Sequence, residues 1–136
     1  MEIFTLKVRI AVLWLISAVI MSASMVIFLL EAGSIEEVMA GQMEGLAINS
    51  ASLVFMALFW LIPLAMAFIT VTVRDSANRW TNVIVGLVFA VFYVFHLLGH
   101  IMQGNLPIEA AVFCVLTILV PAAIVWYAWR WPKPTV

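Results

Sequence analysis

The chain has 136 residues, of which 67% are hydrophobic and only 10% charged, and its mean hydropathy is +1.23. Because a soluble domain is about 45–50% apolar and about 25% charged, this composition excludes a soluble globular enzyme and a disordered tail. Six basic and seven acidic residues leave a net charge of −1, so no basic surface is available for nucleic acid, and we expect the chain to lie in a lipid bilayer.

Four apolar stretches are each long enough to cross a bilayer as a helix. A bilayer core about 30 Å thick needs roughly 20 apolar residues in a helix, whereas a spanning strand is shorter and alternates in polarity. We therefore predict an all-α fold, a transmembrane four-helix bundle in one domain over residues 1–136, with helices at about 8–31, 47–73, 79–103 and 108–131. The first stretch exceeds the about 7–15 apolar residues of a signal peptide, so we interpret it as a retained anchor.

The loop between the first two predicted helices has the pattern of a short amphipathic helix. Ser34 and Glu37 match a capping box, in which each side chain bonds the backbone amide of the other residue. Apolar side chains then recur on one face up to Leu46, and Glu36, Glu37 and Glu44 share another face. We expect this helix to lie in the outer headgroup region as a connector, with a lid over a site between the helices as the alternative.

The turn between the second and third predicted helices is the next polar segment. Asp75 can pair with Arg79, and Ser76 or Asn78 can cap the following helix. A turn of this length forms no pocket by itself, so we expect it to act in topology and capping rather than in catalysis.

A polar stripe runs along the third predicted helix. Its members are separated by seven, three, four and three positions, which places them on one helical face: Gly86, Tyr93, His96, His100 and Gln103. Polar side chains facing lipid would be costly, so this face is expected to point into the bundle. A matching stripe on the first helix ends at Glu31. The candidate ligand or proton site lies in the outer leaflet and consists of Glu31, Tyr93, His96, His100 and Gln103.

His96 and His100, four positions apart, can share a divalent metal ion, to which Glu31 or Glu109 can add an oxygen ligand. The pair lacks the intervening glutamate of the metalloprotease motif, and two ligands on one face cannot reach opposite sides of a haem iron. Two alternatives stay open: a structural histidine, tyrosine and glutamine network, and a site for a small ligand, a quinone or a proton. We predict no catalytic residue, and no cofactor beyond this possible metal ion.

The charges predict the orientation. All six basic residues fall on one side of the four helices: Lys7, Arg9, Arg74, Arg79, Arg130 and Lys133. The charged residues on the opposite side are all glutamates. Basic residues in short loops stay in the cytoplasm, so we expect a multi-pass protein of the bacterial cytoplasmic (inner) membrane with both termini cytoplasmic. Aromatic residues at the same level are expected to anchor the headgroup zone: Trp80, Trp126, Tyr127, Trp129 and Trp131.

Three segments resemble a family of small bacterial membrane proteins that carries a domain-of-unknown-function label. They are residues 62–68 (IPLAMAF), 77–86 (ANRWTNVIVG) and 124–131 (IVWYAWRW). The resemblance covers the second to fourth helices and, more loosely, the first. It implies a four-helix integral membrane protein and supplies no activity, substrate or catalytic residue. His96 and His100 lie outside these segments.

Three functional hypotheses follow. The one we favour is a non-enzymatic bundle that binds itself or a membrane partner through small residues: Ser17, Ala18, Ser22, Ala65, Ala67, Gly86 and Ala90. The second is a small transporter or a ligand- or metal-binding membrane protein that uses Glu31, His96 and His100, with pH-dependent binding. The third is a membrane-embedded redox or metal-dependent enzyme, for which Cys114 and two histidines offer few catalytic groups.

Overall fold

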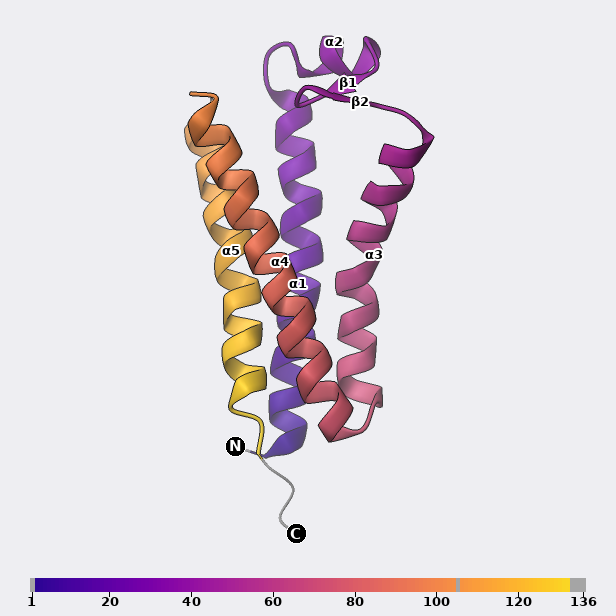
Figure 1. Ribbon diagram of the computed structural model, residues 1–136, viewed down its shortest axis with the longest axis vertical. Coiled ribbons are helices and arrows are strands. Elements are labelled where there is room, and N and C mark those ends of the chain that lie inside the picture. Colours follow the sequence, from indigo (N-terminus) through magenta and orange to yellow (C-terminus); the bar gives the residue numbers. More distant parts are fainter. Residues whose placement is uncertain (1, 105, 133–136) are drawn as a thin grey trace.

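The computed structural model describes residues 2–104 and 106–132, and four long helices dominate it (Figure 1). The elements in chain order are α1 (Ile3–Leu30), α2 (Ser34–Met39), β1 (Gln42–Met43), β2 (Leu46–Ala47), α3 (Ser50–Thr72), α4 (Asp75–Met102) and α5 (Ile108–Trp129). Each of α1, α3, α4 and α5 is long and apolar enough to cross a membrane. The predicted all-α class with four long apolar helices is therefore confirmed, although α1 and α4 begin earlier than expected.

The four long helices run side by side, and the two ends of the bundle differ (Figure 1). One end holds the start of α1, the α3–α4 turn and the end of α5; we call it the terminal end. The other, the hairpin end, holds α2, the β1–β2 hairpin and the α4–α5 turn. Five of the six basic residues lie at the terminal end, and Lys133 lies outside the described residues. Helix α1 packs against α3 and α5, and α4 packs along α5 but scarcely touches α3.

A buried polar network ties three of the helices together near the terminal end. Asn82 Oδ1 accepts hydrogen bonds from Trp14 Nε1 at 2.6 Å and from Thr70 Oγ1 at 3.1 Å. Asn82 Nδ2 donates to Asn78 Oδ1 at 2.7 Å, and Asn78 Nδ2 donates to the Thr70 carbonyl at 2.6 Å. All four residues are 0% exposed. Since a buried polar group without a partner is costly, this network holds α1, α3 and α4 in one register.

The α3–α4 turn uses its polar residues differently from the sequence prediction. Asp75 pairs with Lys7 of α1, at 2.8 Å, and not with Arg79. Arg74 is the N-cap of α4 without a side-chain cap bond, and Asn78 is bonded into the network. The prediction of a capping turn was wrong because the Asn78 side chain bonds a carbonyl of the preceding helix, α3.

The aromatic residues at the terminal end have two roles. Trp80, Trp126 and Trp129 are exposed, as headgroup anchors would be, whereas Trp131 is only 3% exposed and packs in the core. The guanidinium of Arg79 lies 5.4 Å from the Trp80 ring and 5.7 Å from the Trp129 ring. Such cation–π contacts join the start of α4 to the end of α5.

Gly86 allows the backbones of α4 and α5 to approach closely. A Cβ atom at this position would lie 2.9 Å from Val125 Cγ2 and 3.4 Å from the Pro121 carbonyl oxygen. Small residues have this role in membrane bundles, where packing rather than solvent drives helix association. Gly86, placed by its sequence spacing on the polar stripe, is therefore a packing residue.

Replacing Asn82 by leucine tests the network. Asn82→Leu keeps the approximate side-chain shape but leaves the buried Trp14 indole without its acceptor, and a lost partner of this kind costs about 1–3 kcal/mol. We expect thermal unfolding in mild detergent at a clearly lower temperature. The control is Thr81→Val, because the Thr81 hydroxyl bonds only the Ala77 carbonyl of its own helix. Equal unfolding temperatures for Asn82→Leu and wild type would contradict the network's role.

Replacing Gly86 by alanine tests the α4–α5 contact. Overpacking of a tight contact costs about 1–3 kcal/mol, so Gly86→Ala should lower the unfolding temperature despite the better helix propensity of alanine. Gly99→Ala on the same helix is the matched control, because a Cβ there meets no atom within 4 Å. The contact would be refuted if both variants unfolded alike.

Candidate functional site

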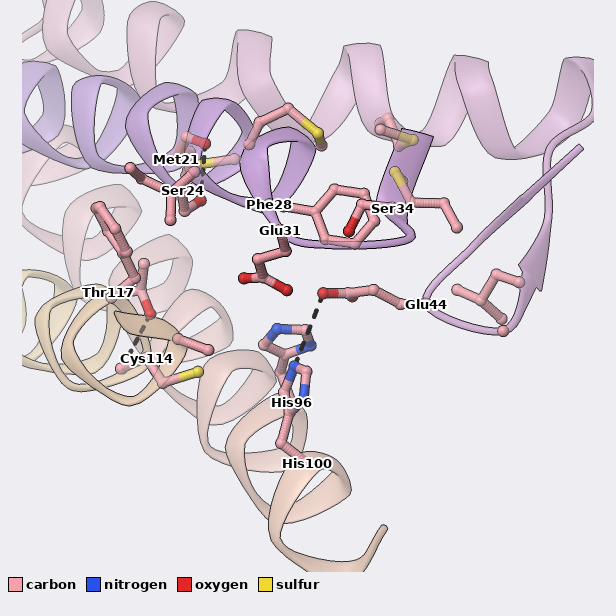
Figure 2. A pocket seen from close by; sticks show the side chains of 18 of the residues that line it. Met21, Ser24, Phe28, Glu31, Ser34, Glu44, His96, His100, Cys114 and Thr117 are labelled. Carbon is pink, nitrogen blue, oxygen red and sulfur yellow. Dashed lines mark hydrogen bonds and ion pairs between the residues drawn. The ribbon is translucent and has the colours of Figure 1, made fainter. Parts of the chain in front are cut away.

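A cavity of about 700 Å³ lies between the long helices at the hairpin end (Figure 2). Residues of all four long helices line it, and α2 and the hairpin bound it. The lining includes every residue of the site predicted from the sequence: Glu31, Tyr93, His96, His100 and Gln103. The spacing argument thus placed these five side chains around one space, although it gave no information on the space itself.

Helix α4 presents its polar stripe to this cavity above a cluster of aromatic rings. Tyr93 is buried, and its ring contacts Phe59 and Phe89 at centroid distances of 5.9 and 6.3 Å. One turn further along, the His96 ring is parallel to the Phe92 ring, and the His96 and His100 centroids are 4.7 Å apart. The two imidazoles are therefore neighbours on one face, as their four-residue spacing predicts.

The segment that closes the hairpin end differs from the predicted amphipathic helix. Helix α2 ends at Met39, and Gly41 follows with a φ of 77°. The predicted capping box is absent: α2 has Gly33 as its N-cap, and the Glu37 side chain instead accepts a hydrogen bond from the Gly45 amide at 3.0 Å. A capping box does form at the start of α3, between Asn49 and Ser52.

Glu44 occupies the tip of the hairpin in an unusual backbone conformation. The strands pair Gln42 with Ala47 and Met43 with Leu46, so Glu44 and Gly45 form a two-residue turn. Their φ angles of 49° and 75° are those of a type I′ turn, in which both central residues have positive φ. Asparagine, aspartate and glycine are usual there, and a glutamate in this region of φ carries strain.

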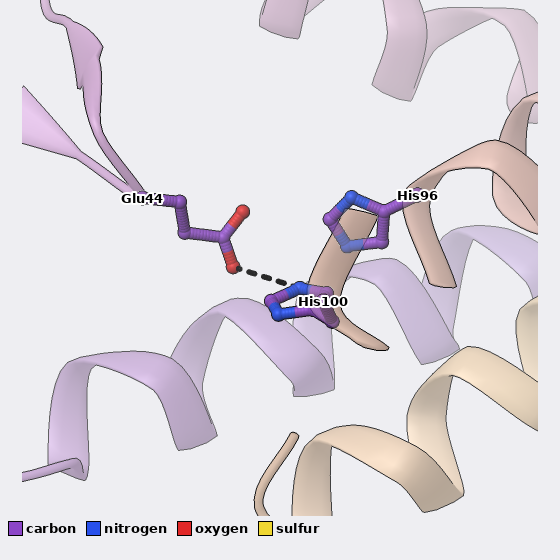
Figure 3. A group of neighbouring side chains, drawn as sticks. All are labelled: Glu44, His96 and His100. Carbon is purple, nitrogen blue, oxygen red and sulfur yellow. Dashed lines mark ion pairs between the residues drawn. The ribbon is translucent and has the colours of Figure 1, made fainter. Parts of the chain in front are cut away.

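This turn brings the Glu44 carboxylate to the two histidines (Figure 3). Glu44 Oε1 lies 3.8 Å from His100 Nε2, and one ligand atom from each of Glu44, His96 and His100 lies within 4.8 Å of the others. The acidic member of the group is thus Glu44, and not Glu31 or Glu109 as we had proposed from the sequence. Sequence reasoning missed it because Glu44 had been assigned to the polar face of a helix; Gly41 and Gly45 were the available signs of a hairpin.

Glu31 points into the same space from the end of α1 (Figure 2). It is the C-cap residue of that helix, beyond the spanning segment. Partial burial raises the pKa of its carboxyl above the ordinary value of 4.5, and the negative charges of Glu109 and Glu44 raise this pKa further. His100 acts in the opposite direction. Glu31, Glu37 and Glu44 all line the cavity, and such an acidic lining favours a bound cation.

The remaining walls of the cavity are mostly apolar and contain sulfur. Cys114 of α5 lines it, and so do four methionines, Met21, Met25, Met43 and Met56. Thr117 donates to the Cys114 carbonyl at 2.9 Å, and Met21 and Ser24 of α1 line another wall (Figure 2). Apolar walls with polar groups that converge on one space are typical of small-ligand binding.

Comparison with known proteins gives no guide to this site. No family model, no curated protein and no solved structure matches the chain. The resemblance of the three sequence segments therefore stays without a matching family model, and the functional argument depends on the cavity.

Removing the Glu31 charge should stabilise the fold in a pH-dependent way. A carboxyl whose pKa is raised by folding destabilises the fold when it is ionised, so the penalty is present at neutral pH and fades as the pH falls through the folded-state pKa. We expect Glu31→Gln to unfold at a higher temperature than wild type at pH 7, with the difference disappearing in acid. Glu36→Gln controls for the loss of one exposed negative charge outside the cavity. A lower unfolding temperature for Glu31→Gln at neutral pH would contradict a penalty on the ionised form of Glu31.

Proposed function

We propose that this protein binds a small ligand in the hairpin-end cavity and lies in the bacterial cytoplasmic membrane with both termini in the cytoplasm. The sorting of the charges supports the orientation, because basic residues in short loops stay cytoplasmic and the described basic residues gather at the terminal end. In this orientation the cavity lies in the outer half of the bilayer and the hairpin faces outward.

The observation that carries the proposal is the group formed by Glu44, His96 and His100 on the wall of this cavity. Ionisable residues at membrane depth are expensive and are usually retained for a function. The volume of about 700 Å³ is also within the range of small-molecule sites, about 300–1,000 Å³. Together these features support a binding or transport protein rather than an enzyme.

Self-association, which the sequence favoured, loses part of its basis. Ser17, Ala67 and Gly86 are buried within a single chain, so they cannot contact a second copy. Ala18, Ser22, Ala65 and Ala90 keep some exposure, but none of them lies in the cavity. Three of the seven small residues thus pack within the bundle, and four keep surface that a contact between copies could use.

The wall between α3 and α4 consists of aromatic side chains. These two helices have few contacts with one another, and the Phe59 ring of α3 bridges them. Phe59 stacks on Phe89 with centroids 4.6 Å apart and lies at the same distance from Phe92. Phe59 and Phe92 also line the cavity, and we infer that a polar ligand enters at the hairpin end, where the charged side chains lie.

The only cysteine of the chain gives a direct test of access and orientation. Cys114 lines the cavity but is only 5% exposed. A small, membrane-impermeant thiol reagent added to spheroplasts should label it slowly from outside, because the reagent can enter the cavity through the hairpin end. The matched control, Ser76→Cys in a Cys114→Ala background, puts the thiol in the α3–α4 turn and should react only after permeabilisation.

Two results would contradict the proposal. Labelling of Ser76→Cys in intact spheroplasts would show that the orientation is reversed. A Cys114 that reacts after unfolding in detergent, but not in permeabilised membranes, would show that the cavity does not admit small molecules.

A further inference from the structure

We propose that the cavity binds a divalent first-row transition-metal ion, with His96, His100 and Glu44 as its protein ligands. The inference rests on the proposed function, because it names the ligand class of the same cavity. It assigns the carboxylate of the hairpin, rather than a helical glutamate, to the ion.

The geometry is close to that of a metal site. Zinc binds imidazole nitrogen at about 2.0–2.1 Å and carboxylate oxygen at about 2.0–2.2 Å, so ligand atoms on one ion are roughly 3–3.5 Å apart. The ligand atoms of the group lie within 4.8 Å of one another, with Glu44 Oε1 and His100 Nε2 at 3.8 Å. These gaps are wider than those between ligands of one ion, so the side chains must rotate to bring all three ligand atoms onto it.

The donor set selects the class of ion. Two imidazoles and one carboxylate hold zinc in metalloproteases, and they hold iron in non-haem oxygenases, in both cases with coordination positions left open. Calcium and magnesium prefer oxygen ligands throughout. We therefore expect binding of Zn²⁺ and Co²⁺, with Mg²⁺ and Ca²⁺ excluded. The cysteine and methionine sulfurs of the cavity would instead suit Cu(I), which makes their participation an outcome to test.

The backbone at Glu44 is a second observation that points to this ligand. Glu44 has a φ of 49°, which asparagine, aspartate and glycine tolerate better, and the bond from the Gly45 amide to Glu37 fixes the turn on α2. Strained residues gather at functional sites, where the strain is part of the mechanism. Here the strained turn holds the Glu44 carboxylate beside the two imidazoles (Figure 3).

The charge around the group is also suited to a cation. Glu31 faces the same space from α1, and the electrostatic influence of Glu109 and Glu44 reaches it. A divalent ion at the histidines would offset this negative charge.

The experiment uses the full chain, purified in mild detergent and stripped of metal with a chelator. Isothermal titration with Zn²⁺ should give one ion per chain, and Mg²⁺ should give no heat of binding. We expect Glu44→Gln, His96→Ala and His100→Ala each to weaken Zn²⁺ binding at least tenfold. Glu36→Gln should bind as wild type does, because Glu36 is an exposed carboxylate of the neighbouring helix α2 that lies outside the cavity.

Glu44→Gly separates a role in metal binding from a role in folding. Glycine adopts positive φ without strain, so this variant should unfold at a temperature no lower than that of wild type and yet lose Zn²⁺ affinity. Loss of both stability and affinity would mean that Glu44 acts through the fold, which would overturn its assignment as a ligand.

Further outcomes would overturn the inference in recognisable ways. Absence of Zn²⁺ binding in a wild-type protein whose Cys114 is labelled from outside would refute the metal site and leave the ligand-binding cavity intact. Zn²⁺ binding unchanged in all three ligand variants would place the ion elsewhere. A thiolate charge-transfer band in the Co²⁺ spectrum, lost in Cys114→Ala, would show that Cys114 binds the ion and would overturn the proposed ligand set.

Discussion

The arrangement of this bundle depends on the need of buried amide and indole groups for partners where water is absent. Asn82 meets this need for Trp14 and Thr70, and it joins three helices near one end of the molecule. Helix α4 is thereby held to α1 and α3 at the terminal end, while along the rest of its length it follows α5. Towards the other end, the aromatic rings of Phe59, Phe89 and Phe92 bridge α3 and α4, and the cavity lies beside these rings.

The two ends consequently differ in chemistry as well as in packing. At the terminal end the polar side chains bond mainly to one another and to backbone carbonyls. At the hairpin end, acidic groups and imidazoles face a common space from separate elements. Polar groups that bond to each other stabilise a membrane bundle, whereas like charges that share a space are stabilised best by a bound counter-ion. The first arrangement supports structure, and the second supports function.

Much of the fold follows from sequence, and the limits have physical causes. Hydropathy and length predict four long helices because a bilayer imposes both, and the spacing of Tyr93, His96 and His100 predicts their common face because helix geometry is regular. Spacing within one helix does not say which loop folds over that face, so Glu44 was missed. The partners of Asn82 were missed for the same reason, since Trp14 and Thr70 belong to other helices and carry no shared periodicity with it.

The hairpin that carries Glu44 has two residues in each strand, and a lone hairpin of two strands is marginally stable at best. Its conformation therefore depends on its attachments, which are the bond to Glu37 and the approach of Glu44 to His100. A ligand that binds only the docked hairpin adds its own binding free energy to the docked state. If the cavity binds a ligand as proposed, the surface at this end would differ between filled and empty molecules, and a second protein that recognises the hairpin would distinguish them without touching the ligand.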